Sequence, residues 1–194
     1  LPAQQEHRRT NRTRRLPRAP KRRSDLVACG KGISSSLPLG AVLGRSDLMD
    51  LPEKGSMSST HSANPFSCAA GLASLQEIEE KNLVVESARK GKILVDRLNQ
   101  IMGKFPSNIL TINGKGLLAA VIFQDPRTGN PDHLTASRIC ERCMHEGVLF
   151  VHTGRESIKM GPPLTIPEVA LSEGLNVFES VVGDIVLENG SYSK

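Results

Sequence analysis

The chain alternates between short apolar runs and longer stretches in which apolar residues recur at helical spacing. Short apolar runs bounded by Gly, Ser, Asn or Pro predict strands, and recurrence at i, i+3 or i+4 predicts helices. Strands are predicted at residues 26–29, 41–44, 109–112, 117–123, 148–151 and 157–160, and helices at about 65–80, 83–102, 134–146 and 167–187. This order predicts a mixed α/β to α+β protein in which short sheets are covered by helices.

Local signals mark several ends of these elements. Asn64 is a good N-cap and Pro65 suits the first position of a helix, so the first predicted helix is expected to begin at Pro65. Asn113-Gly114 is a strong turn signal between two strand-like runs. In the second helix, Leu94 and Leu98 continue an apolar stripe, whereas Lys90 is expected to be solvated.

The positive charge is concentrated at the beginning of the chain. Residues 1–23 contain nine Lys/Arg and one acidic residue, whereas the remainder of the chain is mildly acidic. The segment has no strand or helix periodicity, and we expect it to be disordered. An arginine-rich, acid-poor segment can bind nucleic acid or direct import into an organelle, and these alternatives stay open.

The Gly/Ser-rich turn after the first predicted strand contains one lysine, Lys31. A lysine held between a strand and a tight loop can be partly desolvated, which lowers its pKa from about 10.4. Its neutral amine can then attack a carbonyl carbon, as a Schiff-base enzyme requires. The same pattern also occurs in ordinary surface turns, so Lys31 is a candidate catalytic residue.

Residues 31–42, Lys-Gly-Ile-Ser-Ser-Ser-Leu-Pro-Leu-Gly-Ala-Val, resemble the cofactor-lysine segment of class III aminotransferases, which use pyridoxal 5'-phosphate. A second segment, residues 55–65, contains a stretch from Ser59 to Pro65 that resembles the family's Ser-Thr-x-x-x-Asn-Pro element. By this resemblance, Lys31 forms the Schiff base with the cofactor. The resemblance also implies that Ser59 and Thr60 belong to the phosphate site of a neighbouring subunit, so that a homodimer shares its active site.

A third segment, residues 156–167, resembles the family's late Arg-x-x-Pro-Pro-Leu element, whose arginine commonly binds a substrate carboxylate. This chain has Lys159 at that position. Lysine offers a point charge in place of the planar fork of arginine, so bidentate carboxylate recognition is lost. Lys159 is therefore a substrate-binding candidate, and an exposed strand lysine is the alternative interpretation.

The resemblance implies the end of a fold type I large domain followed by a small C-terminal domain. The expected division is a basic segment at residues 1–23, the C-terminal part of the cofactor-binding domain at 24–104, and a small α+β domain at 105–194. The implied activity is transamination between an amino donor, such as the ω-amino acid 4-aminobutyrate, and a 2-oxo acid. The family's residues upstream of the lysine are not recognisable before Asp25, so the chain is expected to be truncated and inactive alone.

Two other classes of function are compatible with this sequence. In the first alternative, the chain is a non-catalytic fragment that docks on an intact relative. In the second, it is an arginine-rich nucleic-acid-binding protein. The scarcity of aromatic residues argues against a surface on which single-stranded nucleic acid stacks. The sequence contains no apolar run long enough to predict a membrane span. The Cys140-x-x-Cys143 pair lacks two further ligands at metal spacing, so we expect no metal site. The four cysteines are expected to be reduced, and the location to be cytoplasmic.

Overall fold

The computed structural model describes residues 24–57, 59–152 and 154–191. The expected disorder of residues 1–23 lies outside the described residues. The chain divides into two compact units after Ala73, within helix α2 (Pro65–Glu80). The boundary expected after residue 104 separates the two domains of the family, whereas the boundary after Ala73 separates two compact units of this structure. The expected domain boundary stays a prediction.

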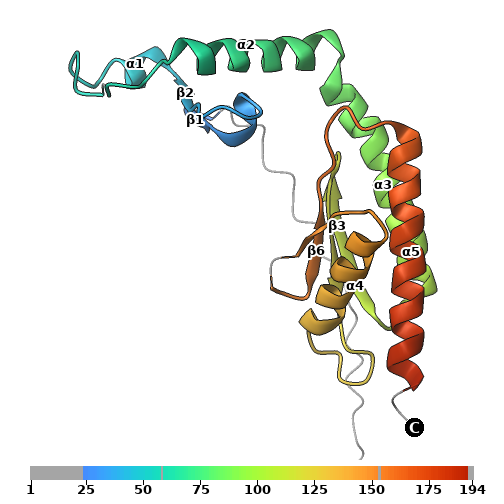
Figure 1. Cartoon of the computed structure of the whole chain (residues 1–194). Helices are drawn as coiled ribbons and strands as arrows, with labels where there is room; N and C mark the ends of the chain where they lie inside the picture. Colours follow the sequence, from blue (N-terminus) through green and yellow to red (C-terminus); the bar gives the residue numbers. More distant parts are fainter. Residues whose placement is uncertain (1–23, 58, 153, 192–194) are drawn as a thin grey trace, which may run out of the picture. The chain divides into compact units, whose positions relative to one another are not determined.

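The first unit contains a two-stranded antiparallel ribbon (Figure 1). Strand β1 (Leu26–Cys29) pairs with β2 (Ala41–Gly44), and both strands have the bounds predicted from the sequence. The loop between them contains a short 3-10 turn, η1 (Lys31–Ile33). A four-residue helix, α1 (Ser46–Met49), follows β2, and α2 begins after the Asn64 cap.

Apolar side chains of the first unit remain uncovered. Within residues 24–73, as far as the structure describes them, no apolar side chain is buried. Leu26, Val42 and Leu43 on the ribbon and Phe66 on α2 are more than half exposed. Isolated two-stranded ribbons are marginally stable, and exposed apolar patches of this kind mark surfaces that other protein segments cover.

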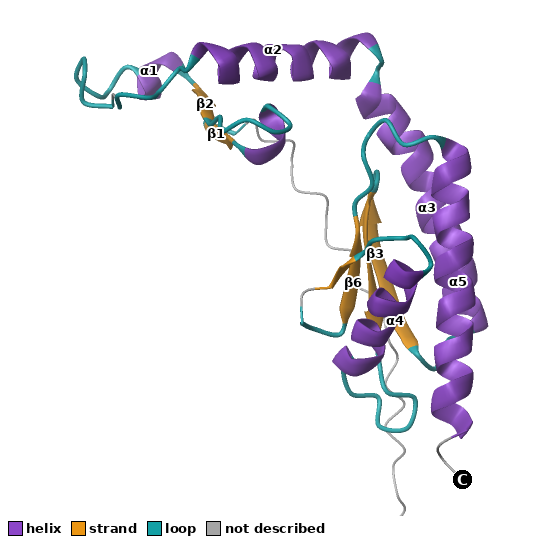
Figure 2. Cartoon of the chain, viewed as in Figure 1, coloured by secondary structure: helices purple, strands orange, loops and turns teal. Residues whose placement is uncertain are grey.

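The second unit is built on a four-stranded antiparallel sheet with strand order β3-β4-β6-β5 (Figure 2). Helices α3 and α4 pack on the sheet, and α5 packs against both helices. The elements are α3 (Leu83–Lys104), β3 (Ile109–Lys115), β4 (Leu118–Phe123), α4 (His133–His145), β5 (Val151–His152), β6 (Ser157–Met160) and α5 (Glu168–Ser191).

Alternate residues of the central strands point into one hydrophobic core. On β4, Val121 and Phe123 are fully buried, and on β6 Ile158 is buried opposite Val121. The core also takes the predicted α3 stripe, including Leu94 and Leu98. Because strand side chains alternate, Lys159 lies on the opposite face of β6 from Ile158 and is exposed.

The turn predicted at Asn113-Gly114 is wrong, because the hairpin between β3 and β4 turns further along the chain. Asn113 and Gly114 lie inside β3, and the two-residue turn is Gly116-Leu117. Gly116 has φ +58°, a left-handed conformation that glycine adopts without strain. Its placement is fixed by α3, because the Ser87 hydroxyl oxygen accepts a hydrogen bond from the Leu117 backbone N–H at 3.2 Å.

The predicted strand at 148–151 is also shorter in the structure. Its first residue, Val148, donates its N–H to the Cys143 carbonyl oxygen at 2.8 Å, and Gly147 has φ +85°. These features form the left-handed C-terminal cap of α4. The cap uses the N–H group of Val148, so regular pairing begins only at Val151.

Lys90 is buried, which contradicts its predicted solvation. Only 8% of its surface is exposed, and its Nζ donates to the Ile166 carbonyl oxygen at 2.7 Å. The carboxylate of Glu86 lies 3.9 Å away on the preceding helical turn. The methylene groups of Lys90 are packed against protein, and its ammonium donates to a backbone acceptor in the loop between β6 and α5. Residue type and spacing alone do not reveal this arrangement.

We expect Lys90→Met to lower the free energy of unfolding by about 1–3 kcal/mol, since the Ile166 carbonyl loses its charged donor. The matched control is Lys92→Met on the same helix, because the Lys92 side chain is 77% exposed. The control is expected to change stability by less than about 0.5 kcal/mol. Urea unfolding of both variants measures this difference, and equal losses would contradict the tether to Ile166.

Ion pairs connect α5 to the other two helices. Glu179 accepts hydrogen bonds from Arg97 and Lys104 of α3. Glu188 accepts from Arg138 and Arg142 of α4, each at 2.6 Å. The hydrogen bond from Lys104, together with the charge of Arg97, lowers the pKa of the Glu179 carboxyl.

We expect Glu179→Gln to cost about 1 kcal/mol of stability at pH 7. The pKa of Glu179 is lower in the folded than in the unfolded state, so its contribution is present above the unfolded value of about 4.3. It is lost as the pH falls through the folded value. Urea unfolding at pH 7 and pH 3, with exposed Glu173→Gln of α5 as control, tests this. A Glu179 effect of equal size at both pH values would contradict it.

Candidate functional site

Lys31 is the first residue of η1, in the connection between β1 and β2. It has φ +49°, a left-handed conformation that is uncommon for a residue with a side chain. The turn is held by the Ile33 N–H, which donates to the Gly30 carbonyl oxygen at 3.3 Å. The buried Ser34 hydroxyl donates to the Leu37 carbonyl oxygen and fixes the loop that follows. Backbone strain persists only where surrounding contacts impose it, and it is concentrated at functional sites.

The Lys31 loop borders an open hollow of about 460 Å³. Its lining consists of Lys31, Gly32, Ser35, Ser36, Leu37, Pro38 and Leu39. The hollow therefore places an amine beside hydroxyl groups and glycine backbone. An amine can hold an aldehyde, and hydroxyl and backbone N–H groups can bind phosphate oxygens.

Helix α2 lies directly against this loop. A Cβ atom at Gly71 would come within 2.6 Å of a Leu39 methyl carbon and 3.6 Å of the Ile33 carbonyl oxygen. The glycine thus allows the helix to approach the segment that carries Lys31. This contact is not evident from the sequence, although a glycine within an Ala-rich helix can signal close packing.

The expected desolvation of Lys31 is not provided by the described residues. Lys31 is exposed, because the hollow is open and its walls come from one loop alone. Cover for this amine would have to come from protein outside the described residues.

Ser59 and Thr60 lie in the loop that precedes α2, and both are exposed. The Ser62 hydroxyl closes this loop by donating to the Ser59 carbonyl oxygen at 2.7 Å. The Asn64 side chain accepts from the Phe66 N–H at 3.0 Å, which confirms the predicted N-cap. Ser59 and Thr60 do not line the hollow beside Lys31.

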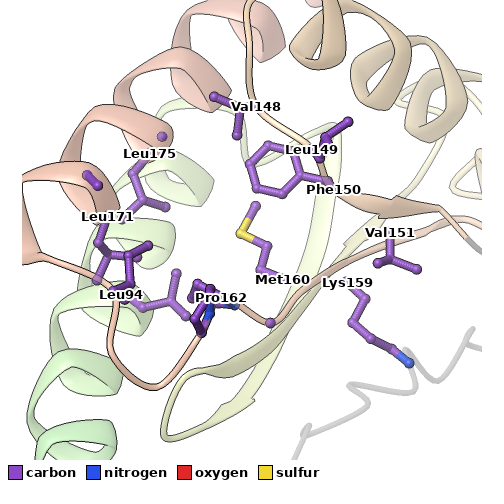
Figure 3. A pocket seen from close by; sticks show the side chains of 15 residues that line it. Leu94, Val148, Leu149, Phe150, Val151, Lys159, Met160, Pro162, Leu171 and Leu175 are labelled. Atoms are coloured by element: carbon purple, nitrogen blue, oxygen red, sulfur yellow. The ribbon is translucent and has the colours of Figure 1, made fainter. Parts of the chain in front are cut away.

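Lys159 belongs to the second unit, in the middle of β6. Its cross-strand neighbours are Ala120 on β4 and Val151 on β5. None of the ion pairs seen among the described residues includes Lys159. Its ammonium is therefore available to an anion, and Lys159 is also one of the residues that line an apolar cavity of the second unit (Figure 3).

The cysteines of α4 are poorly suited to metal binding or nucleophilic chemistry. Burial raises the pKa of the Cys140 thiol to about 11 and that of Cys143 to about 12. Both thiols therefore remain protonated near neutral pH. Within residues 24–57, 59–152 and 154–191, no three His, Cys, Asp or Glu side chains form a group that could hold a metal ion. In the same part of the chain, no helix is long and apolar enough to cross a bilayer.

A family model, Aminotransferase class-III, matches residues 19–182 and so includes Lys31, Ser59, Thr60 and Lys159. The chain belongs to the class III aminotransferases. Members of this family depend on pyridoxal phosphate. The membership inferred from the three sequence motifs is thereby confirmed, whereas the roles of the individual site residues stay predictions.

Curated relatives support the same assignment. A 4-aminobutyrate aminotransferase of Mycobacterium bovis is 32% identical over 163 residues, which is 83% of this chain and 36% of the relative. A probable 4-aminobutyrate aminotransferase of Bacillus subtilis is 35% identical over 159 residues, 80% of this chain and 36% of the relative. An ornithine aminotransferase of Emericella nidulans is 32% identical, covering 83% and 34%. The chain thus spans little more than a third of these relatives' length.

Solved structures confirm the predicted fold class. The acetylornithine aminotransferase of Elizabethkingia anophelis superposes with a TM-score of 0.77 at 28% identity. The match covers 84% of this chain and 40% of that structure. The mixed α/β and α+β fold is therefore that of a fold type I transaminase.

Proposed function

We propose that Lys31 carries pyridoxal phosphate in a transaminase that moves an amino group between an amino donor and a 2-oxo acid. The observation that supports this most strongly is the position of Lys31. It lies in a strained turn beside a polar hollow, within the segment that matches the family. The hydroxyl groups of that hollow fit a phosphate-bearing aldehyde.

The cofactor, when bound, supplies an electron sink for the bond that breaks at the substrate's amine-bearing carbon. The Lys31 amine would hold the cofactor and, once released, carry a proton to and from that carbon. Ser59 and Thr60 would donate hydroxyl hydrogen bonds to the phosphate across a homodimer interface. Lys159 would attract the carboxylate of a substrate through its unpaired ammonium.

The substrate pair and the assembly belong to the same proposal. Relatives named as 4-aminobutyrate and ornithine aminotransferases favour an ω-amino acid as the amino donor and a 2-oxo acid as its acceptor. We propose a cytoplasmic homodimer, with organellar import through the basic segment at residues 1–23 as the alternative location. The family's use of shared active sites and the loop position of Thr60 support the homodimer.

A second candidate function is suggested by the uncovered apolar surface of the first unit. In it, the chain is a non-catalytic fragment that docks on an intact relative. Leu26, Val42, Leu43 and Phe66 would then pack against a partner that supplies the rest of the cofactor domain.

One titration distinguishes the two candidates. The purified chain is mixed with pyridoxal phosphate, reduced with borohydride, digested and mapped by mass spectrometry. The enzyme proposal expects saturable cofactor binding with the label on the Lys31 peptide. Label scattered over surface lysines, with no saturable binding, would contradict it and favour the fragment. Transfer of an amino group from 4-aminobutyrate to 2-oxoglutarate is then measured by product formation.

A further inference from the structure

The loop that carries Lys31 is built around one buried side chain, that of Ser34. Only 3% of the Ser34 surface is exposed, whereas every other residue from 30 to 40 is exposed or half-buried. The Ser34 hydroxyl donates to the carbonyl oxygen of Leu37, three residues later. Burying a hydroxyl is costly unless it is hydrogen-bonded, so this bond determines where Ser34 lies in the loop.

The backbone on both sides of Ser34 is strained. Lys31 has φ +49° and Ser35 has φ +63°, and both conformations are left-handed although neither residue is a glycine. Such residues persist only where other contacts impose them. The hydrogen bond from Ser34 to Leu37 closes a ring that contains Ser35 and Ser36, the two serines that line the hollow.

Helix α2 holds the same loop from outside. The buried residues of α2 are Ser67 and Gly71, which lie about one helical turn apart on one face. A Cβ atom at Gly71 would lie 2.6 Å from a methyl carbon of Leu39 and 3.6 Å from the Ile33 carbonyl oxygen, so this face meets the loop. The loop therefore packs on α2 at Ile33 and Leu39, and between these two contacts the Ser34 hydroxyl fixes the course of the chain.

We propose that Ser34 is a positioning residue whose hydroxyl keeps the Lys31 amine beside the hydroxyl groups of Ser35 and Ser36. The hollow then offers an amine and phosphate-binding hydroxyls together, and it selects an aldehyde with a phosphate over the same aldehyde without one. Ser34 does not line the hollow, so it acts through its neighbours. The proposal rests on the role proposed for Lys31 and names the residue that orients it.

The test compares labelling of Lys31 by pyridoxal phosphate and by pyridoxal, which lacks the phosphate. The full chain is reduced with borohydride over a range of aldehyde concentrations, and the Lys31 peptide is quantified by mass spectrometry, with the exposed Lys54 as internal reference. In the wild type, half-maximal labelling is expected at an at least about tenfold lower concentration of pyridoxal phosphate than of pyridoxal. In Ser34→Ala this ratio is expected to fall below about threefold, while labelling by pyridoxal stays unchanged because the amine remains exposed.

Two further variants separate the hydrogen bond from other effects. Ser56→Ala is the matched control, because the Ser56 hydroxyl makes the same kind of bond, to the Glu53 carbonyl oxygen at 2.8 Å, outside the hollow. It is expected to keep the wild-type ratio. Ser34→Cys nearly keeps the size of the side chain but donates only weakly, so it is expected to behave like Ser34→Ala. A wild-type ratio in Ser34→Ala or in Ser34→Cys would overturn the proposal.

Hydrogen exchange tests the same link without any aldehyde. The N–H groups of Ile33 and Ser36 donate to the carbonyl oxygens of Gly30 and Ser34, at 3.3 and 2.7 Å. In Ser34→Ala their exchange, measured by NMR, is expected to be about fivefold faster, since one hydrogen bond of the loop is lost. Unchanged exchange would overturn the proposal whether or not an aldehyde binds. Absence of saturable Lys31 labelling in the wild type would instead contradict the proposed function, so the two failures are distinguishable.

Discussion

Gly91→Ala is expected to lower the stability of the chain by about 3 kcal/mol or more. A Cβ atom on Gly91 would lie 2.2 Å from the carbonyl carbon and oxygen of Gly116 and 2.5 Å from its Cα. These are backbone atoms of the β3–β4 turn, so no side-chain rotation relieves the overlap. Either α3 or the turn must move, and the turn is held by the Leu117–Ser87 hydrogen bond.

The matched control is Gly103→Ala on the same helix. A Cβ at Gly103 meets nothing within 4 Å, so alanine should raise stability by about 0.5–1 kcal/mol through its higher helix propensity. Circular dichroism during urea unfolding measures both changes. Effects of the same sign and size at the two glycines would refute the close approach of α3 to the turn.

These two glycines show what the sequence could and could not predict. The apolar spacing predicted α3 and its buried face, including Leu94 and Leu98, because helix periodicity depends on near neighbours in the chain. The contact of Gly91 joins it to a residue 25 positions later. No local pattern contains such a contact, and for the same reason the turn was placed wrongly at Asn113-Gly114.

The buried lysine is a second case in which tertiary contacts override a local expectation. Charged residues on a helix are usually solvated, yet Lys90 is covered by the loop that follows β6. The acceptor is the backbone carbonyl of Ile166. Every residue type carries such a carbonyl, so only the position of Ile166 in space makes it the acceptor, and the sequence does not show that position. The apolar cavity beside Lys159 was missed in the same way, since its walls come from α3, the sheet and α5.

The candidate site shows the complementary limit. Its motifs were found because their residues are contiguous: Lys31 with its serines, Ser59 and Thr60 before α2, and Lys159 before its prolines. Contiguous motifs are enough to identify the family, but whether protein covers the Lys31 side chain depends on the whole domain. Within the described residues Lys31 is exposed, in the loop that connects the two strands of an uncovered ribbon. Among the described residues, its reactivity therefore depends on the hollow formed by its own loop.

That dependence leads to the second large effect, which is expected for Lys31→Arg. The variant keeps the positive charge but should lose the pyridoxal phosphate label that borohydride fixes on the wild-type residue. Guanidinium remains protonated at every accessible pH and offers no free amine to an aldehyde. Peptide mapping after reduction is expected to show label on the 31–45 region in the wild type and only background in the variant.

Lys54→Arg provides the control, because Lys54 is the other lysine among the described residues of the first unit. Lys54 lies outside the hollow that places Lys31 next to Ser35 and Ser36. Its replacement should leave the label on Lys31 unchanged, since those neighbours supply the hydroxyl donors for a phosphate. Equal labelling of Lys31 and Lys54 in the wild type would mean that the hollow gives Lys31 no advantage. The chain would then carry the family's lysine without its cofactor chemistry.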